Sequence, residues 1–203
     1  MAKETEQGLG TPLRFEADPE TKRKKGAYRP VFADVFTLPG ASPAKIEKVH
    51  LLVNPFAGKK RGRAVAAQVV ELVERAGIEI TVSYSAYSGH LVTMASALVV
   101  GDHDIIAVVG GDGSLSEAIT GRMLLNGKRT ETFAIVPAGT GNSQAHDLRL
   151  GTPEEAVEAM LNGRRQALDL ARVELTEGLP GSTGEDIVRY SHNLVTWGLG
   201  VDS

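Results

Sequence analysis

Three glycine-rich turns, each placed directly after a short apolar run, limit the possible folds of this chain more than any other feature. The apolar runs are typical of buried strands, and apolar residues at helical spacing separate them. The three junctions are 49–53 before Asn54, 105–109 before Gly110, and 133–136 before Pro137. Short strands that alternate with amphipathic helices predict an α/β fold, a parallel sheet with helices on both faces. In such a sheet the three turns lie at one edge, beyond the carboxyl ends of the strands, where ligands bind.

The segments between the turns complete this α/β pattern. A further strand is predicted over 78–84, and apolar residues three and four positions apart predict three helices. The three helical stripes are Val65, Val69, Leu72, Val73 and Ala76; Leu91, Met94, Ala95 and Leu98; and Leu115, Ala118, Ile119 and Met123. We therefore assign residues 48–150 to one α/β domain.

The segments on either side of this domain differ from it in pattern. Residues 1–47 show no periodicity and carry a basic cluster at Lys22–Lys25 and Arg29, so we expect a disordered or loosely attached segment. Its charge would also suit contact with anionic lipid. In the last segment, 151–203, a capping box at 152–155 predicts a short connecting helix. Strands over 167–175 and 188–195 then resemble the opening hairpin of an antiparallel sheet that is cut short at the end of the chain.

Composition excludes several kinds of site. The chain of 203 residues has no cysteine, which rules out disulfides, thiolate nucleophiles and cysteine-based zinc sites. The 22 Lys and Arg residues against 25 Asp and Glu residues give a net charge of −3, which argues against a nucleic-acid partner. No apolar run approaches the ~18–20 residues that span a bilayer, so we expect a soluble, cytoplasmic protein.

The first turn has the composition of an anion site. Gly58 and Gly62 bracket Lys59, Lys60 and Arg61 just before a predicted helix, whose N-terminal amides favour an anion. The spacing is not that of a Walker loop. A plain surface turn is the alternative.

The second and third turns suit close passage of a phosphate ligand. In the second, tandem glycines precede Asp112, whose carboxylate could hold Mg²⁺ or accept a proton, or else cap the following helix. Glu117 follows about one helical turn later; it could reach a nucleotide or be an ordinary exposed acid. The small residues of the third turn, 137–142, fit a second part of the same ligand.

Together, the three motifs resemble the diacylglycerol kinase catalytic-domain superfamily, which includes sphingosine kinases. They are LLVNPFAGKKRG at 51–62, GGDGSLSEAITG at 110–121 and VPAGTGN at 136–142. The resemblance runs from about Lys48 to Asp202. It implies an ATP-binding α/β domain like those of NAD kinase and diacylglycerol kinase, followed by a β-sandwich that helps enclose a lipid and that this chain does not complete.

The resemblance also implies roles for individual residues. Asp112 would be the base that activates a lipid hydroxyl. The residues implied to bind ATP are Asn54, Lys59 and Arg61 at the phosphates, Ser85 near the nucleotide, Glu117 facing the nucleoside, and Gly111, Gly113, Ser114, Gly139, Thr140 and Asn142 around the pocket. Asp202, in WGLGVD, would meet the amine of a sphingoid base, and Asp169 matches a further lipid-site position. Two positions depart from the pattern: Phe56 stands where sphingosine kinases have arginine, and Thr120 stands where the family often has asparagine.

The activity so implied is that of an ATP- and Mg²⁺-dependent kinase whose lipid substrate lies at a membrane surface, with peripheral membrane contact. A sphingoid base is favoured, because the carboxylate of Asp202 suits a cationic amine, and diacylglycerol is the alternative lipid. A kinase of a soluble substrate also stays open, because NAD kinases share the GGDG turn. So does a nucleotide-binding module without catalysis.

Overall fold

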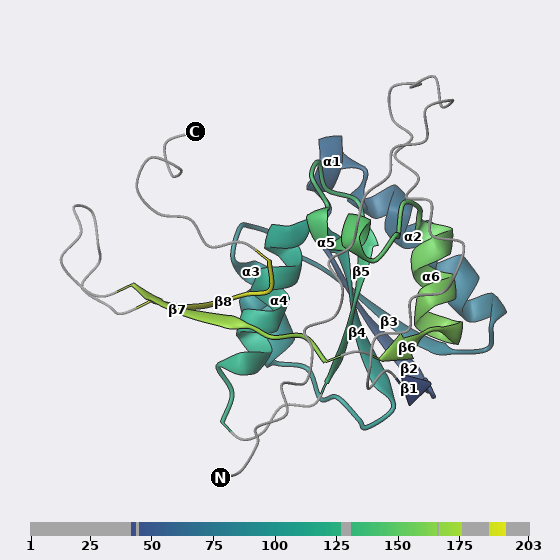
Figure 1. Ribbon diagram of the computed structural model, residues 1–203. Helices are drawn as coiled ribbons and strands as arrows, with labels where there is room; N and C mark the ends of the chain where they lie inside the picture. Colours follow the sequence, from purple (N-terminus) through teal and green to yellow (C-terminus); the bar gives the residue numbers. More distant parts are fainter. Residues whose placement is uncertain (1–41, 44, 127–130, 166, 176–186, 194–203) are drawn as a thin grey trace, which may run out of the picture. The chain divides into compact units, whose positions relative to one another are not determined.

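A four-stranded parallel sheet forms the centre of the computed structural model, which describes residues 42–43, 45–126, 131–165, 167–175 and 187–193 (Figure 1). The strand order is β3–β2–β4–β5. The strands are β2 (Lys48–Val53), β3 (Glu79–Tyr84), β4 (Asp104–Gly110) and β5 (Thr132–Pro137). Val53 pairs with Tyr84 and Val109, and Val109 pairs with Val136, so the carboxyl ends of the strands are level. The predicted meeting of the turns at one edge is confirmed.

Helices cover both faces of this sheet, as predicted. They are α1 (Ala57–Lys60), α2 (Gly62–Arg75), α3 (His90–Ser96), α4 (Asp112–Met123), α5 (Ser143–Asp147) and α6 (Pro153–Asn162). Figure 1 shows α2 and α6 on one side of the sheet and α3 and α4 on the other. Each side has its own apolar core, and α5 contributes to the second.

The central strand β4 explains why the sequence shows a continuous apolar run there. Its neighbours lie on both sides and helices cover both faces, so every residue of 105–109 is at most 2% exposed. Alternate residues enter opposite cores: Ala107 packs on the α2 and α6 side, and Val108 on the α3 and α4 side. Full burial of a valine or isoleucine side chain stabilises the fold by about 1.5–3 kcal/mol. This well-buried strand therefore holds the second turn, which follows it, in a fixed place.

The boundaries of the α/β unit are wider than the predicted 48–150. Ile46 is buried in the core beneath α2, and the Glu47 amide donates to the His103 carbonyl oxygen. Helix α6, which the prediction separates from this domain, packs Ala156 and Met160 into the same core. A lone isoleucine and a short helix carry no periodic signal that would attach them to the sheet.

Two small antiparallel pairs accompany the central sheet. β1 (Ser42–Pro43) pairs with β6 (Arg164–Arg165), a contact that the sequence did not predict. β7 (Ala171–Leu175) pairs with β8 (Ile187–Ser191) in the expected hairpin, although β7 begins four residues later than predicted. Within the described residues, no helix is long and apolar enough to cross a membrane.

Candidate active site

Three turns meet at the carboxyl edge of the sheet, and we call them the turn cluster. They are 54–62, which follows β2, 110–114, which begins at the last residue of β4, and 137–142, which begins at the last residue of β5. The amides of Ala138 and Gly139 both donate to the Gly110 carbonyl oxygen, at 2.9 and 3.1 Å. The Asn54 amide donates to the Val109 carbonyl oxygen at 2.9 Å. Backbone hydrogen bonds therefore join the last residues of β2, β4 and β5 and the turns that follow.

Some glycines of the turn cluster are required by packing between the turns. A Cβ atom on Gly139 would lie 2.7 Å from the Gly111 Cα, and one on Gly58 would lie 1.9 Å from the Ala138 carbonyl oxygen. Real Cβ atoms do not come so close to backbone atoms, so a side chain at either position would force the turns apart. These glycines are explained by the fold, whether or not a ligand binds.

Gly113 has no such explanation. Among the described residues, a Cβ atom on it would meet no atom within 4 Å outside its own stretch of helix, and its φ angle is not left-handed. Glycine in a helix costs up to about 1 kcal/mol relative to alanine, and Gly113 lies in the first turn of α4. The open space above Gly113 is thus where a ligand could approach the backbone closely.

The first turn holds three exposed cations on a strained backbone. Gly58, Lys59 and Lys60 have φ angles of 50°, 61° and 66°, all left-handed. This conformation costs a non-glycine residue about 1–2 kcal/mol, and such strain is typical of functional sites. The Arg61 Nε donates to the Gly58 carbonyl oxygen at 3.2 Å, and α2 begins at the next residue with no side-chain cap on its amides. Free helix amides and cations together favour an anion.

Asn54 and Ser114 connect the first turn to α4. The Asn54 Nδ2 donates to the Ser114 Oγ at 3.1 Å, and the Asn54 Oδ1 accepts the Phe56 amide at 3.0 Å. Ser114 is 8% exposed. Both residues were predicted to contact ATP, and both also hold the turn cluster together.

The Asp112 carboxylate caps α5 rather than its own helix. Its Oδ2 accepts the Ser143 amide at 2.8 Å and its Oδ1 accepts the Gln144 amide at 2.9 Å, whereas Gly111 is the N-cap of α4. The alternative prediction that Asp112 caps α4 is therefore wrong. Burial opposes ionisation of this carboxyl, but the amides of Gln144 and Ser143, together with the His192 ring, outweigh that effect and lower the pKa of Asp112. Asp112 is therefore ionised at neutral pH.

Glu117 ties α4 to the turn between β3 and α3. Its Oε1 accepts the Gly89 amide at 3.0 Å, and the side chain is half-buried, so the alternative of an ordinary exposed acid is wrong. In the same turn, Ser85 is buried and its amide donates to the Val53 carbonyl oxygen at 2.8 Å. His90 accepts the Ala86 amide on Nδ1 at 3.0 Å. Ser85 and Glu117 thus lie at the same sheet edge as the turn cluster.

The third turn ends in a strained asparagine. Asn142 has a left-handed φ of 55°, and its Nδ2 donates to the Gly139 carbonyl oxygen at 2.9 Å. Its Oδ1 is buried and accepts no hydrogen bond from the residues that the structure describes. A buried oxygen without a donor costs about 1–3 kcal/mol, which a bound ligand or water could recover. Thr140, two residues earlier, is exposed.

The proposed lipid-binding residues do not join this site in the described structure. Asp169 is exposed between β6 and β7, and Asp202 lies outside the described residues. Two surface hollows lie elsewhere, one between α2 and α6 and another between β5 and α6, and neither contains a predicted site residue.

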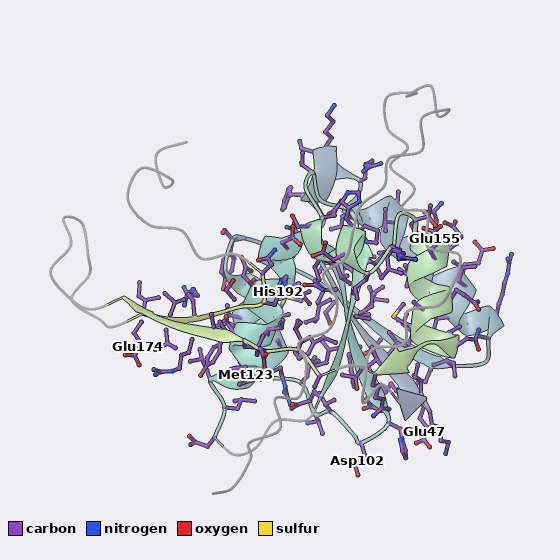
Figure 2. The ribbon with its side chains drawn as sticks, in the orientation of Figure 1. Glu47, Asp102, Met123, Glu155, Glu174 and His192 are labelled. Atoms are coloured by element: carbon purple, nitrogen blue, oxygen red, sulfur yellow. The ribbon has the colours of Figure 1, made fainter. Side chains whose placement is uncertain are left out.

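Two contacts to α4 come from β8 and the residue just after it, a segment that the sequence did not link to the site. His192, just after β8, is 8% exposed; Figure 2 labels it beside α4. Its Nδ1 lies 3.1 Å from the Gln144 Oε1, and its Nε2 lies 3.3 Å from the Asp112 carbonyl oxygen. Thr120 on α4 accepts the Tyr190 amide on Oγ1 at 3.0 Å. The alternation in this strand predicted a hairpin, but it held no signal for a partner 80 residues away.

The residues present fit a magnesium ion that arrives with a nucleotide. In the described part of the chain, no group of three or more His, Asp or Glu residues could hold a metal on its own. Mg²⁺ commonly takes one or two carboxylates and fills its other positions with phosphate oxygens and water. Asp112 is the one carboxylate of the turn cluster and can serve in that way.

Comparison with known proteins places these motifs in a family. The diacylglycerol kinase catalytic domain matches residues 48–173. Sphingosine kinase B of Dictyostelium discoideum is 31% identical over 68% of this chain and 18% of its own length. Sphingosine kinase 1 of Arabidopsis thaliana is 30% identical over 86% of this chain and 36% of its own. Diacylglycerol kinase of Bacillus subtilis is 27% identical over 63% and 42%. The chain thus spans less than half of each relative, and it belongs to the diacylglycerol kinase catalytic-domain family.

Proposed function

We propose that this chain is the nucleotide-binding part of a lipid kinase, which transfers the γ-phosphate of ATP to a primary hydroxyl of a lipid. The observation that carries the proposal is the ionised Asp112 carboxylate in a cluster of three turns that also holds exposed cations and open backbone. Membership of the family supports the same activity.

In this proposal the first turn holds the phosphates. Lys59, Lys60 and Arg61 are exposed beside the uncapped start of α2, and their charge would offset that of the triphosphate. Gly113 leaves room for a phosphate group next to the backbone. When bound with ATP, Mg²⁺ would neutralise further phosphate charge, and Asp112 is the residue that would hold it.

Asp112 would also take the proton in the chemical step. The lipid hydroxyl oxygen forms a bond to the γ-phosphorus, the bond between that phosphorus and the bridging oxygen breaks, and ADP leaves with that electron pair. The hydroxyl proton passes to a carboxylate oxygen of Asp112. Because the pKa of Asp112 is lowered, its carboxylate is ready to accept but only weakly basic, so the proton moves late. A loose transition state demands little basicity, since positioning and charge neutralisation dominate such reactions.

A sphingoid base is the substrate that we favour, and diacylglycerol is the second candidate. Two of the relatives above are named sphingosine kinases, and Asp202 offers a carboxylate for a cationic amine. The Bacillus subtilis relative is named diacylglycerol kinase and has similar identity, which supports the neutral lipid.

Transfer of label from γ-labelled ATP to sphingosine, diacylglycerol or NAD tests the proposal directly. We expect transfer to a lipid, and a loss of at least about a hundredfold in Asp112→Asn. Asp102→Asn, a change of an exposed acid between α3 and β4, is the matched control and should keep full activity. Binding of ATP without transfer to any lipid would instead support a non-catalytic module, and transfer only to NAD would support a soluble-substrate kinase. Asp202→Asn should reduce transfer to sphingosine more than transfer to diacylglycerol.

A further inference from the structure

Asp112, Gln144 and His192 form a closed ring of three hydrogen bonds. The backbone amide of Gln144 donates to the Asp112 Oδ1 at 2.9 Å. The side-chain Oε1 of Gln144 lies 3.1 Å from the His192 Nδ1, and the His192 Nε2 lies 3.3 Å from the backbone carbonyl oxygen of Asp112. Asp112 lies on α4, Gln144 lies on α5, and His192 follows β8. The ring therefore joins two turns of the turn cluster to the antiparallel hairpin.

The hydrogen-bonding groups of the ring can be satisfied in either charge state of His192. A carbonyl oxygen can only accept, so Nε2 must carry a proton to bond to Asp112. If the His192 side chain is an imidazolium, its Nδ1 also donates, to the Gln144 Oε1. If the His192 imidazole is neutral, its Nδ1 accepts a hydrogen bond. The side-chain amide of Gln144, turned by 180°, then donates to it from the Gln144 Nε2. His192 thus keeps hold of both partners in either state.

A second contact holds β8 along the same helix. The Tyr190 amide donates to the Thr120 Oγ1 at 3.0 Å, and Thr120 is fully buried two turns beyond Asp112. His192 follows Tyr190 by two residues and reaches the first turn of α4. The β8 segment therefore contacts α4 at two points, Thr120 and Asp112. The second of these is the residue that we assign as the base.

We propose that His192 is a positioning residue, which holds Asp112 and Gln144 in their reactive arrangement only while the β7–β8 hairpin is docked on α4. This inference rests on the proposed kinase function.

Substitutions on both sides of the ring test the inference. His192→Phe keeps an aromatic ring of similar size but removes both bonds, and we expect kcat to fall about tenfold while the KM for ATP changes less than twofold. His192→Asn keeps an amide group near the Nδ1 position but loses the bond to the Asp112 carbonyl oxygen, so it also opens the ring and should lower kcat by a similar factor. Gln144→Met opens the ring from α5 and should cost a similar factor. His103→Phe, the same change at an exposed histidine before β4, should leave kcat unchanged.

The double variant tests whether His192 and Gln144 act together as one hydrogen-bonded ring or make two independent contacts. If His192 and Gln144 act as one unit, His192→Phe combined with Gln144→Met should lose no more kcat than the worse single variant. Losses that multiply, or a native fold with unchanged kcat in His192→Phe, would overturn the inference. Should His192→Phe not fold, Gln144→Met and His192→Asn decide it by the same criteria.

A carboxyl NMR titration of Asp112 tests the ring without any turnover. In folded His192→Phe the pKa of Asp112 should rise toward its ordinary value, because the electrostatic contribution of His192 is lost and the hydrogen-bonded ring no longer orders the Gln144 backbone amide. An unmoved Asp112 signal would contradict the inference. If the unaltered chain transferred no phosphate to a lipid, the proposed function would fail, whereas the NMR comparison would still decide the role of His192.

Discussion

Replacing Gly113 with alanine should stabilise the fold and weaken nucleotide binding at the same time. The new Cβ atom meets nothing within 4 Å in the part of the chain that the structure describes, its own helix aside, and the backbone at this position is ordinary helix. Alanine is favoured over glycine in a helix by up to about 1 kcal/mol, and less near a helix end, so we expect the free energy of unfolding to rise by about 0.5–1 kcal/mol. For a chain of this length that corresponds to an increase in Tm of roughly 1–4 °C.

The effect on binding has the opposite sign. The open space over Gly113 lies beside Asp112 and Ser114 in the turn cluster, where we place the phosphates of ATP. A methyl group there prevents close approach to the backbone. We expect the Kd for ATP to rise at least tenfold, or about 1.4 kcal/mol.

Thermal unfolding and calorimetric titration with ATP measure the two effects on the same sample. Gly101→Ala is the matched control: its Cβ would lie 3.4 Å from a carboxylate oxygen of Asp104, an ordinary contact outside the turn cluster, so ATP affinity should stay unchanged. A Gly113→Ala variant with raised Tm and unaltered ATP affinity would refute the placement of the ligand. A lowered Tm would refute our account of the packing around Gly113.

Three further changes test the packing and electrostatics. Gly139→Ala puts a Cβ 2.7 Å from the Gly111 Cα, so its free energy of unfolding in urea should drop by about 1–3 kcal/mol, opposite in sign to Gly113→Ala. Asp104 and Asp112 have lowered pKa values in the folded protein. The stability that these carboxylates contribute is complete above the ordinary aspartate pKa of about 3.9 and is lost as the pH falls through their pKa values in the folded state. The free energy of unfolding in urea should therefore fall in acid, and less steeply in Asp104→Asn. Thr152→Ala breaks the capping box of α6 and should lower the free energy of unfolding by about 1 kcal/mol, whereas no loss would show that the cap is dispensable.

The sheet and the place of the site could be predicted from the sequence because both depend on local patterns. A run such as 105–109 is apolar at every position, which indicates a strand covered on both faces. Parallel strands then bring their carboxyl ends to one edge, whatever the details of packing. This property of parallel sheets was enough to predict that the turns after β2, β4 and β5 lie together.

The contacts inside the site could not be predicted, because they join residues far apart in the chain. Asp112 bonds amides 31 and 32 positions away, and the His192 ring reaches back 80 positions. Aspartate before a helix has a familiar local partner in that helix, and the structure instead uses a helix beyond the next strand. Such a choice depends on how the turns dock, which no periodicity records.

The Asp112 carboxylate has a structural role besides its proposed role as the base. Its carboxylate accepts the Ser143 and Gln144 amides, so the same bonds that keep it ionised also hold the third turn and α5 in place. In Asp112→Asn the amide oxygen can accept only one of these donors, and the new NH₂ group faces the other. Loss of a bond to a charged acceptor costs about 1.5–3 kcal/mol, so this variant should unfold at lower urea concentration as well as lose activity. If Asp112→Asn is as stable as the unaltered chain, Asp112 does not cap α5 in solution; if it is destabilised, part of its kinetic loss belongs to the turn cluster and not to proton transfer.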